Sequence, residues 1–361
     1  YSDNTVTAYD EERKWKKYTF DGLGNLTQVN EPNPADASHD AISVYTYDAL
    51  GHLTNVDLRR WNAIASVYEH QYRAFTYGMT QLSNATNPES GTVNYGYSNG
   101  LLSWKTDAKG GKVEYSYDSY NRVSQIRHYP AEYPFSGVGE DTCQRVDFTY
   151  DSNPDSGFTY LAGRLATRTY SVCVQPNGGA GASAKTTFTE SYGYSQGGQP
   201  SRKRLRVSRV LTNQYQQTVT VQRDLDGSWG YTAGRLNTVT YPAGSSGPVA
   251  GTYTVGYDSM DRLNTLNDGV GPAVVSGVTY GVAGQLVSVS GLYTESRSYD
   301  ERLRLTGLNG ATFGYKVNGR IETETVGGET ITYQYDALNR LISSSSNQGW
   351  SQGYNYDGYG N

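Results

Sequence analysis

One short pattern recurs from one end of this chain to the other, and a tandem repeat decides an architecture before any local preference does. Each copy has an aromatic residue, any residue, Tyr and Asp, then two residues, Gly or Asn, a polar residue and Leu. Ser or Thr and a β-branched residue follow. The good copies are YTFDGLGNLTQV from Tyr18, YTYDALGHLTNV from Tyr45, YSYDSYNRVSQI from Tyr115, VGYDSMDRLNTL from Val255 and YQYDALNRLISS from Tyr333. The chain is therefore expected to be an array of one small unit.

Each copy predicts an antiparallel β-hairpin. Tyr, Thr, Val and Ile alternate with period two on either side of a break, which is typical of half-buried strands. Asp opens the turn because its carboxylate accepts backbone N–H groups two residues on, and Gly or Asn closes it by tolerating positive φ. We therefore expect structural roles at the turns for Tyr47, Asp48, Gly51, Tyr117, Asp118, Asn121, Tyr257, Asp258, Tyr335, Asp336 and Asn339.

The hairpins are expected to pair edge to edge in one long antiparallel sheet, because an isolated hairpin is only marginally stable in water. Two copies are interpreted as carrying inserts in the turn: FTYD at Phe148 resumes at Gly163, and VTVQRD at Val219 resumes at Gly234. No stretch predicts a long helix. The charged segment EERKWKK from Glu11 is interpreted as an edge strand. The fold class that follows is all-β.

The composition argues against nucleic-acid and membrane-binding functions. The 361 residues include 34 Tyr and carry a net charge of -5, the wrong sign for a protein dedicated to nucleic acid or anionic membranes. No apolar run approaches the roughly 18 residues that a membrane helix needs, so no transmembrane segment is expected. Both ends fall within the repeat pattern, so we interpret residues 1–361 as one segment of a longer repeat array.

The pattern resembles the RHS or YD-repeat family, which takes its name from the Tyr-Asp dipeptide. The dipeptides that carry the resemblance are Tyr47-Asp48, Tyr117-Asp118, Tyr150-Asp151, Tyr257-Asp258, Tyr299-Asp300, Tyr335-Asp336 and Tyr356-Asp357. The resemblance implies a sheet that winds spirally into a hollow shell. It also implies a container or extracellular scaffold like those of insecticidal toxin complexes, bacterial polymorphic toxins and teneurins. The self-cleaving DPxG motif of the toxin branch does not occur in the sequence.

Motifs that suggest catalysis have a simpler structural interpretation. GYSNG around Ser98 and GYSQG around Ser195 match a hydrolase elbow, but both serines precede turns, no helix pattern follows, and no His comes after His128. The recurring Asp residues fit turns better than a pair of glycosidase carboxylates. No Cys or His spacing suits a metal. We therefore predict no catalytic, cofactor-binding or metal-binding residue and no enzyme activity.

Two surface features have both a binding and a structural interpretation. Arg202, Arg204 and Arg206 share one face of a predicted strand and could contact acidic cargo or an anionic glycan, but a solvated face with charges against aggregation is the favoured interpretation. Tryptophans could stack on sugars, although packing within the sheet is favoured. These residues are Trp61, Trp104, Trp229 and Trp350.

Cys143 and Cys173 are expected to form a disulfide across a hairpin. If the interrupted hairpin keeps the common register, Tyr150 opposes Leu165, and counting outward places Cys143 opposite residue 172, next to Cys173. That offset is near the Cα separation of about 5.5 Å that a disulfide needs. The bond would indicate export to an oxidising compartment.

The leading hypothesis is a structural shell segment of a large secreted or surface-displayed bacterial RHS protein that encloses a toxin or other polypeptide. Its partners would be flanking repeats of the same or another chain, and the enclosed cargo. The alternative is an extracellular adhesion or carbohydrate-binding scaffold that contacts cell-surface glycans through inserts such as residues 129–142.

Overall fold

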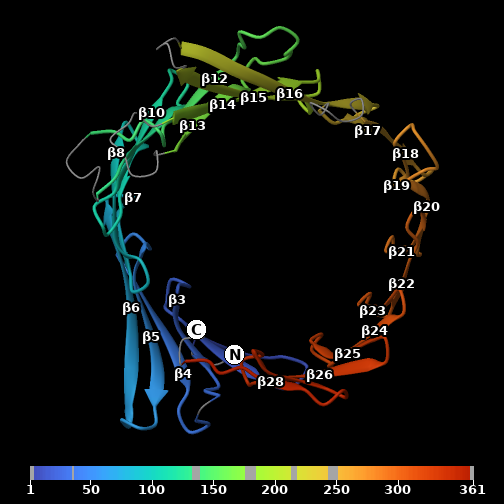
Figure 1. The fold of residues 1–361 in the computed structure, drawn as a ribbon. Coiled ribbons are helices and arrows are strands. Elements are labelled where there is room, and N and C mark those ends of the chain that lie inside the picture. The colour runs from blue at the N-terminus through green and yellow to red at the C-terminus, as the bar shows by residue number, and fades with distance from the viewer. Residues whose placement is uncertain are drawn as a thin grey trace. The chain divides into compact units, whose positions relative to one another are not determined.

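The computed structural model of this chain describes residues 4–34, 36–131, 139–174, 184–212, 218–242 and 251–357. Within these ranges the chain forms 28 strands of one sheet and no helix (Figure 1). Each strand pair with a determined register is antiparallel and joins strands that follow one another in sequence, as β4 and β5 do. The predicted all-β fold of tandem hairpins in one long antiparallel sheet is therefore confirmed.

The chain divides into two compact units. The first contains Tyr1–Asn94, Tyr280–Ser288 and Glu295–Asn361. Its N-terminal strands are β1 (Thr5–Tyr9), β2 (Trp15–Phe20), β3 (Leu26–Glu31), β4 (Ala41–Tyr47), β5 (Leu53–Asn62), β6 (Val67–Gly78) and β7 (Gln81–Asn87). Its C-terminal strands are β22 (Glu295–Tyr299), β23 (Leu305–Leu308), β24 (Ala311–Tyr315), β25 (Ile321–Val326), β26 (Glu329–Tyr335), β27 (Leu341–Ser346) and β28 (Ser351–Gly353).

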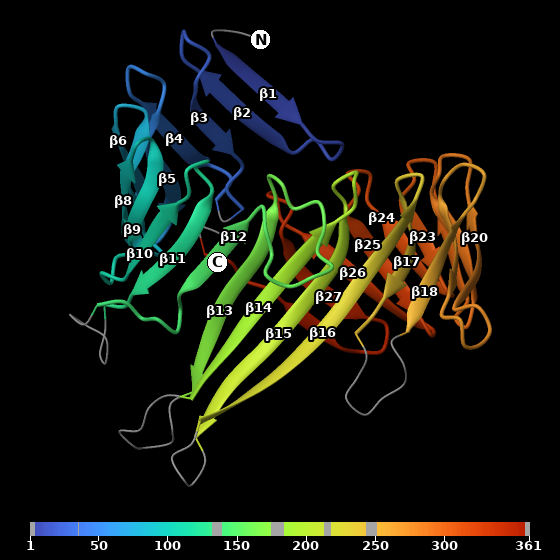
Figure 2. The ribbon, with the colours of Figure 1, turned by 90° about the horizontal axis from the view of Figure 1, so that it is seen from above.

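The second unit contains Tyr95–Thr279 and Val289–Thr294. Its strands are β9 (Leu101–Thr106), β10 (Lys112–Tyr117), β11 (Val123–Tyr129), β12 (Val146–Tyr150), β13 (Leu165–Val174), β14 (Ala184–Tyr194), β15 (Pro200–Thr212), β16 (Thr218–Thr232), β17 (Arg235–Thr240), β18 (Thr252–Tyr257) and β19 (Leu263–Asn267). Strands β13 to β16 are 10 to 15 residues long and lie side by side (Figure 2). Strands β8 (Gly91–Ser98), β20 (Val275–Tyr280) and β21 (Leu286–Gly291) lie where the chain passes between units.

The YD hairpins share one register. Tyr47 pairs with Leu53, but the preceding Thr46 pairs with Asn55, so Thr54 is an extra residue and forms a β-bulge. The same shift precedes the aromatic residue at Phe20, Tyr77, Tyr117, Tyr150, Tyr194, Tyr231, Tyr257, Tyr299, Tyr315 and Tyr335. A bulge increases the local right-handed twist. Its recurrence places the same local distortion beside the turn of each of these hairpins.

The structure corrects two boundaries. The segment from Glu11 is not an edge strand. Glu11–Lys14 belong to the turn of another YD hairpin, in which Asp10 accepts the N–H of Glu12, and Trp15–Lys17 begin β2, which pairs with both β1 and β3. The prediction of an interrupted repeat that starts at Val219 is also wrong. Strand β16 runs without interruption through this residue, and the motif tyrosine of the repeat is Tyr231, which pairs with Leu236. Both errors came from irregular spacing between copies.

Side chains of this sheet are mostly half-buried. Phe158 and Leu161, each 8% exposed, form the described core cluster with Ala166, and Tyr194 packs against it. These residues belong to the insert between β12 and β13 and to the strands beneath it. Elsewhere in the described ranges the buried apolar residues are the scattered Val29, Ala41 and Ala85, so contacts between neighbouring repeats must supply much of the stability.

Candidate functional site

The turn that follows the Tyr-Asp dipeptide is the structural site that recurs along the chain. At Asp258 one carboxylate oxygen accepts the N–H groups of Met260 and Arg262, each at 2.9 Å, and the Asp261 N–H donates to the Asp258 carbonyl. Asp261 has a φ of 64°, the left-handed conformation that the motif assigns to Gly or Asn. The Arg262 N–H, assisted by the Arg262 side chain and opposed by burial, holds the pKa of Asp258 below its usual value.

The residue after the left-handed position returns to the same Asp. Arg262 Nε donates to the second carboxylate oxygen of Asp258 at 2.8 Å. Equivalent side chains that bind their own turn Asp in this way are Asn25, His52, Arg122, Arg304 and Arg340. We call this position the exit residue. An Asp and an exit residue four positions apart therefore close each of these turns.

The exit residue also contacts the next repeat. The Arg122 guanidinium lies 4.2 Å from the ring centroid of Tyr150, and Arg340 lies 4.6 Å from that of Tyr356. The same cation–π arrangement joins Arg164 to Tyr194, Arg235 to Tyr257, Arg304 to Tyr315 and Arg320 to Tyr335, while His52 stacks on Tyr77. Arginine over an aromatic ring is a favourable contact when partly desolvated.

The motif tyrosine completes the connection. Tyr257 donates its hydroxyl to the carbonyl of Leu236 in the preceding repeat at 2.7 Å. The same bond joins Tyr47 to Leu26, Tyr117 to Leu102, Tyr150 to Val123, Tyr194 to Leu165, Tyr231 to Pro200, Tyr299 to Leu286, Tyr315 to Leu305, Tyr335 to Ile321 and Tyr356 to Leu341. The backbone carbonyl at the motif Leu position thus accepts a hydrogen bond from the Tyr of the following repeat. The combined sites form a ladder of repeat-to-repeat contacts.

The other sequence-predicted turn residues occupy this ladder. Asp48, Asp118 and Asp336 each accept the N–H groups two and four residues on. Gly51, Asn121 and Asn339 have φ values of 84°, 62° and 64°. The regular Asp and Arg spacing of four residues was a visible signal for the exit contact. The Tyr-to-Leu contact had none, because it joins separate repeats.

The structure joins Cys143 and Cys173 in a disulfide with a Cα separation of 5.7 Å. The sequence argument placed Cys143 opposite residue 172, one residue short. The bulge accounts for the difference: Tyr150 pairs with Leu165 but Thr149 with Thr167, so the register outward from the turn moves by one residue. Cys143 lies in a turn before β12, where its N–H donates to Asp141.

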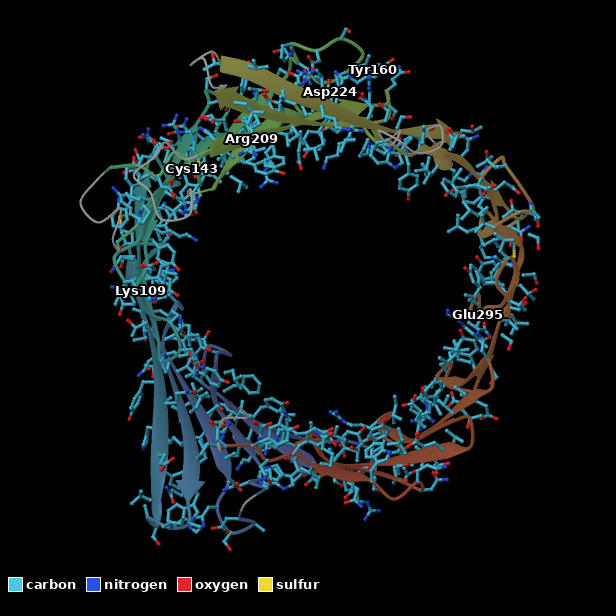
Figure 3. The ribbon with its side chains drawn as sticks, in the orientation of Figure 1. Lys109, Cys143, Tyr160, Arg209, Asp224 and Glu295 are labelled. Atoms are coloured by element: carbon cyan, nitrogen blue, oxygen red, sulfur yellow. A yellow bond between two sulfur atoms is a disulfide. The ribbon has the colours of Figure 1, made fainter. Side chains whose placement is uncertain are left out.

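Acidic partners neutralise the basic stripe. Arg206 pairs with Asp224, Arg204 with Asp226, and Asp155 from the insert binds both arginines at 3.1–3.3 Å. Figure 3 shows Tyr160 and Asp224 on one side of this part of the sheet and Arg209 on the other, in agreement with the strand register. The stripe is therefore an internal ion-pair network that fastens the insert, and its charges are not free for an acidic ligand.

Candidate catalytic groups have structural partners. Ser195 occupies the turn Asp position, where its hydroxyl accepts the Gln199 N–H and donates to the Gln199 side chain. Ser98 ends β8 before Asn99 and Gly100, both of which have positive φ.

No group of three His, Cys, Asp or Glu side chains suited to a metal occurs in the described parts of the chain. The same parts contain no helix long and apolar enough to cross a membrane.

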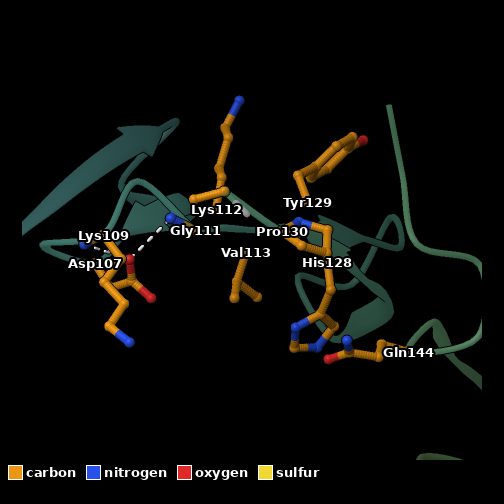
Figure 4. Close-up of a pocket in the computed structure, with 10 residues that line it drawn as sticks. Asp107, Lys109, Gly111, Lys112, Val113, His128, Tyr129, Pro130 and Gln144 are labelled. Atoms are coloured by element: carbon orange, nitrogen blue, oxygen red, sulfur yellow. Dashed lines mark hydrogen bonds between the residues drawn. The ribbon is translucent and has the colours of Figure 1, made fainter. Parts of the chain in front are cut away.

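A hollow of about 280 Å³ lies beside the turn at Asp107 (Figure 4). Lys109, Lys112, His128 and Tyr129 line it. Asp107 accepts the N–H groups of Lys109 and Gly111, so its carboxylate is again a turn group. Half of the insert at residues 129–142, namely residues 132–138, lies outside the described residues.

The teneurin YD-shell family model matches residues 75–360 of the chain. The chain belongs to this family. No curated protein matches the sequence of this YD-shell segment. Among solved structures, the crystal structure of TcdB2-TccC3 is similar with a TM-score of 0.55 and 14% identity, covering 92% of this chain and 20% of that chain. A mutant Tc holotoxin pore from Photorhabdus luminescens has a TM-score of 0.53 and 14% identity, covering 94% and 18%.

These structures have the same fold as the YD-shell segment. The segment spans about a fifth of the length of each solved chain. It is a structural segment of an RHS-type shell, built from the repeat-to-repeat ladder described above.

Proposed function

We propose that residues 1–361 form part of the wall of a large secreted or surface-displayed bacterial RHS-repeat protein, and that this wall encloses a toxin or other polypeptide. The segment would have no enzymatic role. The observation that carries the proposal is the ladder of hydrogen bonds from a motif Tyr to the motif Leu position of the preceding repeat, because ten such bonds join neighbouring repeats. A wall requires such continuous lateral contact.

Two further features support this function. The described strands form one continuous sheet, and a sheet of this kind separates two spaces efficiently. The Cys143–Cys173 disulfide suits export to an oxidising compartment. The similar solved structures are parts of toxin complexes by name, and this favours a polypeptide toxin as the enclosed material. Flanking repeats of the same or another chain would supply the remaining wall.

Electron microscopy of the full-length parent protein tests enclosure directly. A closed wall with density inside is expected, together with a polypeptide that resists added protease until the wall is denatured. An open wall with an empty interior, and no protected polypeptide, would overturn enclosure. Binding to a glycan array that depends on the 129–142 insert would then favour an extracellular adhesion scaffold.

A further inference from the structure

The turn at residues 10–14 has the backbone of a YD turn but a different exit contact. Asp10 accepts the N–H groups of Glu12 and Lys14 at 2.9 and 2.8 Å, and Arg13 takes the left-handed position with a φ of 62°. Lys14 is the exit residue. Its ammonium lies 3.4 Å from a Glu12 carboxylate oxygen in its own turn but does not return to the turn Asp as the arginines of other turns do. It donates instead to a second turn, 322 residues away in the sequence.

That second turn is residues 336–340, in the same compact unit. Lys14 Nζ donates to the Asp336 carbonyl at 2.7 Å and to Asn339 Oδ1 at 2.8 Å. Asn339 Nδ2 donates in return to the second carboxylate oxygen of Asp10 at 3.2 Å. The second carboxylate oxygen, which binds an exit arginine in other turns, therefore binds Asn339 of the second turn here. The two turns exchange their contacts.

The residue types explain this exchange. A lysine carries a compact ammonium on a flexible stem, whereas an arginine fork matches a carboxylate and stays with its own turn Asp. Asn339 can serve both partners, because its amide has an acceptor for Lys14 and a donor for Asp10. Glycine, which holds this position in the turn at Gly51, could do neither. Lysine at the exit and asparagine at the left-handed position thus form a matched pair.

Neighbouring groups strengthen the contact. Lys316 Nζ lies 3.9 Å from a carboxylate oxygen of Glu12, and Asn318 Nδ2 donates to Asn339 Oδ1 at 3.2 Å. The Lys14 side chain is only 22% exposed. Partial burial reduces screening of its charge-assisted hydrogen bonds by water and salt. Figure 1 shows β1–β3 beside β26–β28, in agreement with these contacts.

We propose that a YD turn with lysine at the exit position is a docking element for a YD turn with asparagine at the left-handed position in a distant repeat. Lys14 is the residue that determines this specificity. The partner class is therefore another YD turn, and the contact seals the wall where distant repeats meet. The inference deepens the proposed wall function, but it requires no cargo.

The test compares K14R, K14A and the matched control R262K in the full-length protein. R262K makes the reverse change at an exit residue that binds its own turn Asp. Hydrogen exchange is measured at residues 10–14 and 336–340. We expect both K14R and K14A to raise exchange about tenfold at the two turns. In K14R the guanidinium returns to Asp10, and in K14A the ammonium is lost, so either change releases Asn339. R262K should leave both turns unchanged.

A second measurement uses a carbodiimide, which condenses a carboxyl group and an amine into an amide. Mass spectrometry should find a Glu12–Lys316 cross-link in the wild-type protein. K14R should decrease it strongly, although this variant also removes the Lys14 amine, which competes for Glu12 at 3.4 Å. Wild-type exchange and cross-linking in K14R would overturn the lysine specificity, and the same result in K14A would overturn the docking contact. Loss of enclosure with both signals intact would count only against the proposed function.

Discussion

The hydroxyl of Tyr257 donates a 2.7 Å hydrogen bond to the backbone carbonyl of Leu236, one repeat earlier in the chain. Tyr257→Phe removes this donor and keeps the ring. Because a part-buried carbonyl then loses its partner, the free energy of local opening at β17 and β18 should fall by about 1 kcal/mol. Native-state hydrogen exchange at the amides of these two strands measures the change.

Tyr293→Phe is the matched control, because Tyr293 is 83% exposed. This substitution should change exchange in the second unit by less than about 0.5 kcal/mol. Equal protection in the Tyr257→Phe variant and the wild type would show that the Tyr-to-Leu bond contributes nothing to the wall.

The turn carboxylates predict loosening in acid. The pKa values of Asp258 and Asp300 are lowered first by the backbone N–H groups of Arg262 and Arg304, against an opposing effect of burial. A lowered folded-state pKa stabilises the fold above the unfolded value of about 3.9, and this contribution is lost as pH falls through the folded value. The turns should therefore loosen below about pH 4. Carboxyl NMR titration follows each Asp directly.

Asp258→Asn provides the control for acid sensitivity. Asparagine keeps an oxygen for the Met260 and Arg262 N–H groups but has no carboxylate to titrate. Its turn should be weaker at neutral pH and should respond less to acid than the wild-type turn. An Asp258 carboxyl that titrates at its ordinary pKa in the wild type would contradict the prediction.

The sequence could predict the turn and the Tyr–Leu pairing beside it because both depend on residues within one repeat. Asp48 and Gly51 lie three positions apart, and their chemistry fixes the turn without distant help. The partner of a tyrosine hydroxyl depends on how separate repeats pair, which the spacing does not record. Lys14 and Asp336 lie still farther apart, and no local pattern brings them together. Local chemistry was therefore predictable, and contacts between repeats were not.

The one-residue error at the disulfide has the same physical origin. A bulge adds a residue to one strand, so counting outward from Tyr150 and Leu165 drifts by one position. Bulges depend on twist and pairing as well as on residue type. The sequence thus located the two cysteines in one hairpin but not in their final register.

The Cys143–Cys173 bond predicts a local effect of reduction. The cysteines are 30 residues apart, and closing a loop of that length typically contributes about 2–4 kcal/mol. A C143S/C173S variant should exchange faster in β12 and β13, with no change in β26 and β27. Reduced wild-type protein should match the variant. Free thiols in protein purified without reductant would contradict the bond.

The insert at residues 152–161 is predicted to depend on Asp155 for its attachment. Asp155 binds Arg204 at 3.3 Å and Arg206 at 3.1 Å, and its side chain is 21% exposed. Asp155→Asn removes the charge that holds both arginines, although each keeps an acidic partner on β16. Limited proteolysis within the insert should become about tenfold faster, because the cleavable open state is more populated.

Salt should weaken the same attachment, since a 1 M solution shortens the screening length to about 3 Å. Wild-type protein in high salt should therefore approach the Asp155→Asn variant at low salt, and the variant should respond less. Glu89→Gln is the control, because it removes an exposed charge paired with Arg73 far from the insert in sequence. Cleavage that is indifferent to both salt and Asp155 would mean that the buried ring of Phe158, 8% exposed, holds the insert without the ion pairs.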